Sequence, residues 1–192
     1  DALLDSEWKG VLIDKSLLRG VGFKLRNKQV IALKNLTDIL KRNGVVVSDV
    51  NKMLNSPDQM SNFLFKTLKL KPFKKTPGGA NSVDKEVLEY HKKELFCEFL
   101  LEYRELVKLL STYVVGICDA IYDDGLLHTS FALHLTGTGR SSSSNPNMQN
   151  VPKRKNRFIR KMFIAPKNHL ILSFDYSGAE VRCMAMESKD RT

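Results

Sequence analysis

The sequence predicts an α+β fold that is predominantly helical, with a small antiparallel sheet toward its C-terminal end. Two observations carry this prediction. Apolar residues recur at helical spacing through residues 25–43 and 93–118. After a turn signal at 123–125 the pattern changes, and apolar and polar side chains alternate through 126–135 as they do in a strand.

Length and composition set the class of protein. The 192 residues are 42% hydrophobic and 27% charged, which suits one globular domain or two small ones. No apolar run approaches the roughly 18 residues of a membrane span, and the N-terminus lacks a signal peptide pattern. Cys97, Cys118 and Cys183 lie far apart, which excludes a disulfide framework and a CxxC zinc site and favours the cytoplasm. Because the chain begins at Asp1 rather than Met, we expect a piece of a larger protein.

The first 70 residues are predicted to be mainly helical. Residues 1–24 combine a short helical start, an apolar VLI segment and a break at Gly20-Val21-Gly22, and a helix over 25–43 ends at Asn43-Gly44. A short extended link follows over 45–47. Ser56 then caps a helix that runs to about residue 70, with Pro57 in its first position and Gln59 completing a capping box.

The middle of the chain is predicted to hold a basic loop and a long helix. Residues 71–79 are rich in Lys, Pro and Gly, and a short helix follows over 83–91. The helix over 93–118 spans roughly 35 Å at 1.5 Å per residue, enough to lie across a nucleic-acid duplex. Its periodicity alone fits a plain helical hairpin equally well.

The last third is predicted to be irregular and then to end on a strand and a helix. Residues 136–152 are polar and irregular, and 158–163 form a short helix or turn. Residues 170–174 are apolar apart from Ser173 and predict a buried strand that ends at Asp175. A helix is expected from Ala179 onward, with Val181, Met184 and Ala185 facing inward.

Charge is concentrated in one stretch. The net charge is +10, yet the fifty residues 125–174 contain no Asp or Glu and eight Lys or Arg residues. A stretch so cleared of carboxylates indicates a polyanionic partner such as nucleic acid. The alternative is a solvated basic face that binds nothing.

Asp175 is the first carboxylate after this stretch. A carboxylate at the end of a buried strand, beside a basic surface, suits a hard cation such as Mg²⁺. Phosphoryl-transfer enzymes need such a metal, because it neutralises phosphate charge and lowers the pKa of an attacking hydroxyl. For Asp175 taken alone, the simpler interpretation is a cap for the following helix.

Several segments resemble the family A DNA polymerases, the bacterial DNA polymerase I type, in family order. Asp175-Tyr176-Ser177-Gly178-Ala179-Glu180-Val181-Arg182 is similar to that family's motif A, and residues 138–152 (TGRSSSSNPNMQNVP) are similar to its DNA-contact segment, usually TGRLSSxxPNLQNIP. Shorter matches are His128-Thr129-Ser130-Phe131, Glu102 to Leu106, Ser111-Thr112-Tyr113, Ser56 to Met60, Lys74-Lys75-Thr76 with Ser82-Val83-Asp84, and Gly10 to Asp14.

This resemblance implies a domain layout and partners. Residues 1–24 would enter the palm, 25–118 would form a helical thumb, and 119–192 would form the N-terminal part of the palm with motif A, leaving the fingers and the rest of the palm absent. The implied partners are primer–template DNA, a dNTP and two Mg²⁺ ions in the complete enzyme. A second polypeptide carrying the fingers and motif C is a further implied partner, a membrane is not, and the implied location is the cytoplasm, in the nucleoid or a phage-infected cell.

The resemblance also assigns site residues. Asp175 would be catalytic and bind metal with the Tyr176 carbonyl, Glu180 would act as the steric gate against a ribose 2′-OH, and Arg182 would support the site. The nucleotide would contact Tyr176, Ser177, Gly178, Ala179 and Glu180. DNA contacts are implied for Lys75, Asn81, Ser82, Arg104, Lys108, Thr112, Arg140, Ser142, Ser143, Asn147, Gln149, Asn150 and Arg154.

Physical chemistry agrees with the DNA assignments. A polymerase grips duplex without reading its sequence, so it binds phosphates and the minor groove, whose acceptors are nearly the same for every base pair. Arg140, Gln149 and Asn150 are suitable minor-groove donors, and Ser142, Ser143 and Asn147 suit sugar–phosphate contacts. Basic residues between Lys153 and Lys161 supply electrostatic attraction.

The sequence also departs from the family pattern. Gly178 and Ala179 replace the usual Gln and Ile of DYSQIELR, and Ser141 replaces a common Leu. Gly178 and Cys183 resemble the SGxExRC form of some phage replicative polymerases. No HDE motif with the second metal-binding carboxylate is present, so we expect this chain alone not to polymerise DNA. The alternatives are a non-catalytic duplex-binding module, one subunit of a split polymerase, and a single-subunit RNA polymerase, against which Glu180 argues.

Overall fold

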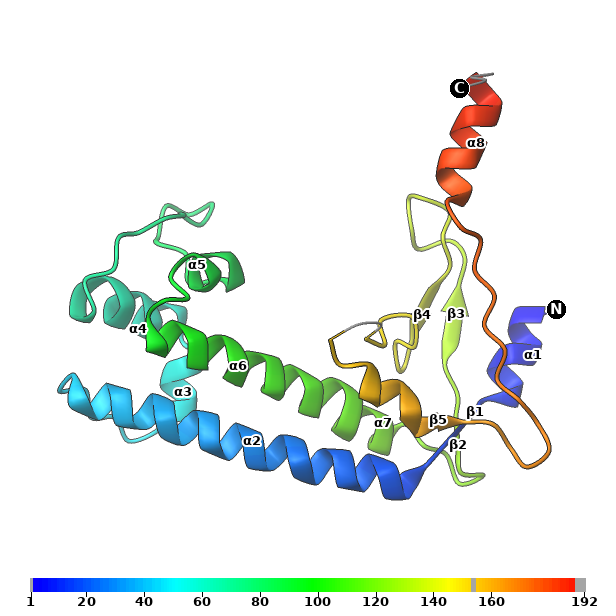
Figure 1. Ribbon diagram of the computed structural model, residues 1–192, viewed down its shortest axis with the longest axis horizontal. Coiled ribbons are helices and arrows are strands. Elements are labelled where there is room, and N and C mark those ends of the chain that lie inside the picture. Colours follow the sequence, from blue (N-terminus) through cyan, green and yellow to red (C-terminus); the bar gives the residue numbers. More distant parts are fainter. Residues whose placement is uncertain (1, 153–154, 189–192) are drawn as a thin grey trace.

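The computed structural model describes residues 2–152 and 155–188, and two long antiparallel helical stretches form its body (Figure 1). Helix α2 (Lys15–Arg42) packs along α6 (Leu95–Leu109), and α6 continues through the π-helical segment η2 (Leu110–Val115) into α7 (Gly116–Asp119). The long helix predicted over 93–118 is therefore confirmed, with a change of helical pitch near its end.

Helix α2 begins ten residues earlier than the sequence predicts, because Asp14 caps it. The Asp14 carboxylate accepts a hydrogen bond from the Leu17 backbone N–H at 2.8 Å. The break predicted at Gly20-Val21-Gly22 was wrong, since all three residues are helical. A Cβ on Gly22 would stand 2.9 Å from a Val114 methyl, so this glycine permits close packing of α2 against η2.

The stretch between the two long helices is also helical. Helix α3 (Val50–Asn55), which the sequence analysis missed, begins where the Asp49 side chain accepts from the Lys52 backbone N–H. Helix α4 (Pro57–Ser61) begins at Ser56 as predicted, and its fold continues as the π-helical η1 (Asn62–Thr67). After the basic loop comes α5 (Lys85–Tyr90), which confirms the short helix predicted over 83–91.

Two small antiparallel sheets lie beyond the helices. Strand β1 (Val11–Ile13) pairs with both β2 (Leu126–Leu127) and β5 (Phe163–Ile164), and this joins the N-terminal helix α1 (Ala2–Lys9) to the second half of the chain. Strand β3 (Ser130–Ala132) pairs with β4 (Ser142–Ser144). The segment 136–152 is thus not wholly irregular, and a 3-10 helix, η3 (Arg157–Met162), lies at the predicted short helix.

The core lies between α2, α6 and the short helices that cover them. Leu36, Leu100 and Phe96 are fully buried, and the Phe96 ring packs against Phe63 with centroids 4.6 Å apart. This single cluster extends to Ile159 and Met162 on η3. The basic segment that follows the polar stretch is therefore anchored to the helical body.

The C-terminal prediction was wrong in its packing. Residues 170–174 form no strand, and Leu170 and Phe174 are 85% and 88% exposed. Helix α8 (Ala179–Ser188) forms where a helix was predicted, but none of its residues is buried, so Val181, Met184 and Ala185 do not face inward. An apolar segment becomes a buried strand only when other strands pair with it, and none in the described chain does so.

Among the described residues, no helix is both long and apolar enough to cross a membrane.

Candidate nucleic-acid interface

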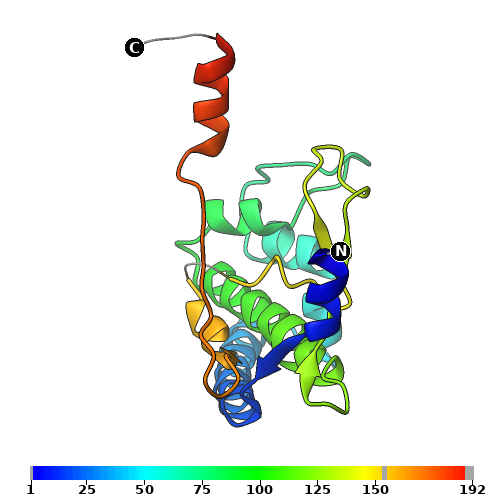
Figure 2. The same cartoon turned by 90° about the vertical axis from the view of Figure 1, so that its right-hand side faces the viewer.

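The predicted DNA-contact residues on loops stand on the side of α6 that faces away from α2. Figure 1 shows α5 and the basic loop at one end of α6 and the β3–β4 hairpin at the other, and Figure 2 shows both above the α2–α6 pair. These loops and the intervening part of α6 form the candidate interface.

The basic loop supplies one group of these residues. Lys75 is exposed and pairs through its backbone with Asn81 in an isolated antiparallel bridge. Ser82 is only 6% exposed, and its hydroxyl accepts from the Asp84 backbone N–H at 3.2 Å. Ser82 therefore braces the start of α5 from inside, while Lys75 faces solvent.

Helix α6 and its continuation supply a second group. Arg104 and Lys108 line a groove of about 880 Å³ between α2, α6 and the residues around Phe158. The Arg104 guanidinium donates to the Val83 carbonyl at 2.8 Å, and burial lowers its pKa while Asp84 opposes that effect. Thr112 is exposed on η2. Arg104 thus holds α5 against α6 as well as lining the groove.

The polar segment 141–152 has a defined conformation. Asn147 Oδ1 accepts from the backbone N–H groups of Gln149 and Asn150, each at 3.1 Å, which forms a tight turn. The Gln149 side chain donates to the Ser141 hydroxyl at 2.9 Å. Asn147, Gln149 and Asn150 are exposed, so this turn presents three amide side chains to solvent.

Two serines predicted to contact DNA are used inside this segment. Ser143 is 4% exposed, and its hydroxyl accepts from the Met148 backbone N–H at 2.9 Å and shares a hydrogen bond with Thr129 at 2.6 Å. The Ser142 hydroxyl donates to the Ala132 carbonyl at 3.3 Å, and Ser142 remains partly exposed. The geometry therefore gives Ser143 a structural place under the turn.

Two sets of contacts hold the polar segment and the residues that follow it, Lys155 and Asn156, against the long helix. The Tyr113 hydroxyl donates to the Asn150 carbonyl at 2.6 Å. The Glu105 carboxylate accepts from Lys155 and, at 2.9 Å, from the Asn156 side chain. Burial alone would raise the pKa of Glu105, but these hydrogen bonds outweigh burial and lower it.

The motif A segment is exposed throughout. Residues 175–180 are all exposed, and no strand directly precedes Asp175 in the described chain. The prediction that Asp175 stands at a sheet edge was therefore wrong. The Arg140 guanidinium forms an ion pair with the Glu180 carboxylate on the first turn of α8, which brings the two motifs together. Arg182 is exposed, and its backbone N–H donates to the Gly178 carbonyl at 2.9 Å.

The fit of this segment to Mg²⁺ is partial. Within residues 2–152 and 155–188, no three His, Cys, Asp or Glu side chains are placed to share a metal ion. Magnesium sites in nucleotide enzymes commonly use one or two carboxylates together with substrate phosphates. Asp175 can supply one such ligand, and in the described chain no hydrogen bond or ion pair links it to the 141–152 segment.

Some features outside this interface escaped the sequence analysis. Helix α2 carries eight Lys or Arg residues and one acidic residue, Asp38. The net charge of the whole chain does not reveal this basic helix, because acidic residues elsewhere offset it. His128 bridges the Glu7 carbonyl at 2.7 Å and Asp124 at 3.0 Å, and thereby ties α1 to the β2 turn. Arg154, a predicted DNA contact, lies outside the described residues.

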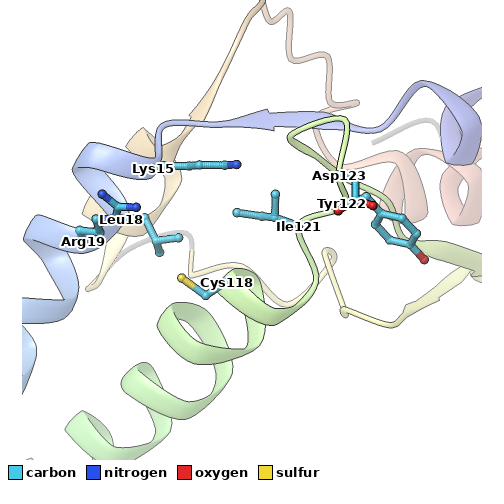
Figure 3. Close-up of a pocket in the computed structure, with 7 residues that line it drawn as sticks. All are labelled: Lys15, Leu18, Arg19, Cys118, Ile121, Tyr122 and Asp123. Atoms are coloured by element: carbon cyan, nitrogen blue, oxygen red, sulfur yellow. The ribbon is translucent and has the colours of Figure 1, made fainter.

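A second cavity lies apart from these groups. It measures about 360 Å³, and Figure 3 shows it between the start of α2 and the end of α7, with Lys15, Arg19, Cys118 and Tyr122 among the residues around it. None of the predicted DNA-, metal- or nucleotide-contact residues lines it.

Comparison with known proteins agrees with the motifs. Residues 26–192 match the family model described as DNA polymerase family A. The chain is 34% identical to DNA polymerase I of Lactococcus lactis and 37% identical to that of Caldicellulosiruptor bescii, in each case over at least 98% of its length. It is 43% identical over 142 residues to the thermostable DNA polymerase I of Thermus aquaticus. It spans about a fifth of the length of these relatives.

The fold is also found in solved polymerase structures. The POL domain of Pol1 from M. smegmatis, in complex with DNA primer-template and dNTP, superimposes with a TM-score of 0.84 at 29% identity. The match covers 98% of this chain and 33% of that domain.

Proposed function

This chain belongs to DNA polymerase family A, and on that premise we propose that it is the part of a template-directed DNA polymerase that grips primer–template duplex and supplies the motif A aspartate. Residues 25–118 would act as the thumb, 1–24 as the entry to the palm, and 119–192 as its N-terminal part. The reaction of the complete enzyme is nucleotidyl transfer from a dNTP to a primer 3′-hydroxyl.

The observation that carries the proposal is the fixed, acid-free polar segment. Its exposed Gln149 and Asn150 are donors suited to minor-groove acceptors, and hydrogen bonds within the protein hold the turn that carries them. Tyr113 links that turn to the long helix. A preorganised turn loses less conformational entropy on binding than a flexible linker does, so the segment is suited to holding DNA of any sequence.

Electrostatics supports the same partner. The stretch 125–174 carries eight basic residues and no acid. Duplex DNA releases counterions when such residues neutralise its phosphates, which makes binding strong at low salt and independent of sequence. Phosphate contacts position the duplex, and minor-groove contacts keep its register without selecting a sequence.

In this proposal, Asp175 and the Tyr176 carbonyl would hold Mg²⁺ when the nucleotide is bound. When bound, the ion would neutralise charge on the phosphates and lower the pKa of the attacking hydroxyl. Tyr176, Ser177, Gly178 and Ala179 border the nucleotide. Glu180 excludes a ribose 2′-OH, and its present partner Arg140 is then released to the minor groove.

Catalysis requires more than this chain provides. Two-metal nucleotidyl transfer needs a second carboxylate, and the sequence has no HDE motif. We therefore propose that the chain alone is inactive and works with the fingers and motif C, either within one longer polypeptide or as a separate subunit. The proposed location is the cytoplasm, at the nucleoid or in a phage-infected cell.

A chimera tests this function. The matching fifth of the Caldicellulosiruptor bescii relative is replaced by this chain, and primer extension with dNTPs is measured after thermal unfolding has shown that the chimera folds. The proposal predicts that the chimera extends the primer. The D175N chimera should lose this extension and keep its affinity for duplex DNA. A folded chimera that binds duplex but extends no primer would make this chain a non-catalytic DNA-binding module, and incorporation of ribonucleotides would indicate an RNA polymerase.

A further inference from the structure

The basic loop that precedes α5 is a folded hairpin. The Thr76 N–H donates to the Ala80 carbonyl at 2.7 Å, the Gly79 N–H to the Thr76 carbonyl at 2.9 Å, and the Ser82 N–H to the Lys74 carbonyl at 2.8 Å. Residues 71–80 are nevertheless all exposed. With no buried residue to hold this span in place, its position depends on contacts with α5.

Lys74 makes the most direct of these contacts. Its ammonium lies 2.9 Å from the Asp84 carboxylate and 2.5 Å from the Glu86 carboxylate. Asp84 is also the cap of α5, accepting from the Val87 backbone N–H at 3.0 Å. The hydrogen bond from Lys74 is the main reason that the pKa of Asp84 falls to about 2, and the pKa of Lys74 is raised in return, chiefly by Glu86.

Two contacts beside Lys74 fasten the same loop to the same helix. The Phe73 ring stacks on the Tyr90 ring with centroids 4.4 Å apart and planes 5° from parallel. The His91 Nε2 lies 3.0 Å from the Lys71 carbonyl. Helix α5 is in turn held to α6 through Arg104, so the loop is connected to the long helix by a continuous set of contacts.

Lys75 differs from its neighbour. It is exposed, and in the part of the chain that the structure describes no carboxylate lies within ion-pair distance of it. The charge of Lys74 is already balanced by two carboxylates, whereas the charge of Lys75 is available to a phosphate. Two adjacent lysines of the same loop are thus placed for different tasks.

We propose that Lys74 is a positioning residue, which holds the loop 71–82 against α5 through Asp84 and Glu86 so that Lys75 meets the DNA backbone. This inference rests on the proposed DNA-binding function. A charge swap separates positioning from direct contact, because K74E/E86K forms the ion pair between positions 74 and 86 in the opposite sense with no change in net charge. A direct phosphate contact by Lys74 cannot be restored by that swap.

The test compares K74E, K74E/E86K and K75Q in the full chain. Duplex affinity is measured by fluorescence anisotropy over a range of KCl, and amide hydrogen exchange is followed at Thr76, Gly79 and Ser82. We expect K74E to lose amide protection and about tenfold in affinity, and the double variant to regain both. K75Q keeps full protection but reduces the slope of log K against log[KCl] by about 0.9, the value for one lost phosphate contact.

Two results would overturn the inference. One is a K74E variant whose loop amides stay protected, since Lys74 then does not hold the loop. The other is a K74E/E86K variant that regains protection but not affinity, since Lys74 then contacts phosphate itself. Failure of the wild-type chain to bind any duplex would instead overturn the proposed function, and the hydrogen-exchange comparison would still decide whether Lys74 positions the loop.

Discussion

The hydroxyl of Tyr113 donates a 2.6 Å hydrogen bond to the backbone carbonyl of Asn150, and this bond joins the end of the long helix to the polar segment 141–152. Tyr113 is 6% exposed, and burial raises the pKa of its phenol. The bond is therefore partly shielded from water, and it links the Asn147–Asn150 turn to the end of the long helix.

Removal of that hydroxyl should loosen the turn. We expect Y113F to lower the free energy of unfolding by about 1 kcal/mol, because the Asn150 carbonyl loses a buried donor. Urea denaturation checks the stability, and duplex affinity should fall with it. The matched control is Y122F, since Tyr122 is 63% exposed; equal losses in both variants would contradict the assignment.

Two glycines of α2 should respond to alanine in opposite directions. Nothing lies within 4 Å of a Cβ on Gly20, so G20A should raise the free energy of unfolding by about 0.5–1 kcal/mol through helix propensity. G22A should lower it, because the new methyl would stand 2.9 Å from Val114. Paired urea titrations measure both changes, and a stabilising G22A would show that α2 and η2 pack less closely.

The His128 contact should make stability depend on pH. Both ring nitrogens face acceptors, and the Glu7 carbonyl first and Asp124 second raise its pKa. Because the pKa of His128 is higher in the folded state, the protonated imidazole stabilises the fold at pH values below the unfolded-state pKa of about 6.5. This stabilisation is lost as the pH rises through the folded-state pKa. The Tyr122 ring edge also meets the imidazole.

The corresponding measurement compares the wild-type chain with H128Q. Their difference in Tm should be larger at pH 6 than at pH 9, where neutral His128 keeps only one of its two hydrogen bonds. A difference that does not change over this range would show that the imidazolium contributes nothing. The comparison is kept above the acidic range, because the Leu126 backbone N–H and then His128 lower the pKa of Asp124, and this carboxylate contributes its own pH dependence in acid.

The ion pair between Arg140 and Glu180 should restrain DNA binding by this chain. E180Q frees the guanidinium for the duplex, so we expect affinity to rise about threefold and the salt dependence to steepen, since one more phosphate or groove contact forms. E187Q removes the same charge from the exposed α8 without touching Arg140. If E187Q raises affinity equally, the effect is one of net charge rather than of the pair.

Local signals predicted the helices whose ends are encoded nearby. Ser56 and Pro57 start α4, and Asn43-Gly44 end α2 as expected. The beginning of α2 was misplaced because Gly20 and Gly22 favour a break in isolation. The tight contact of Gly22 with Val114 is a tertiary fact that no local pattern contains.

The predictions for residues 170–174 and for residues 142–144 were wrong for opposite reasons. An apolar run indicates burial only if strands exist to pair with it, and for Leu170 and Phe174 the described chain provides none. Ser142–Ser144 carries no β-forming signal, yet it becomes a strand because Ser130–Ala132 lies opposite. The candidate site residues came from the resemblance, whereas the hydrogen bonds of Ser143 and Tyr113 and the ion pairs of Lys74 could be seen only in the structure.

The most direct test of the account is a salt titration of duplex binding by the wild-type chain. Anisotropy with two blunt duplexes of unrelated sequence should give equal affinities and a slope of log K against log[KCl] of about −3 or steeper, as expected for three or more neutralised phosphates. A slope near zero, a strong preference for one sequence, or no binding at 50 mM KCl would contradict the claim that this chain is a DNA grip.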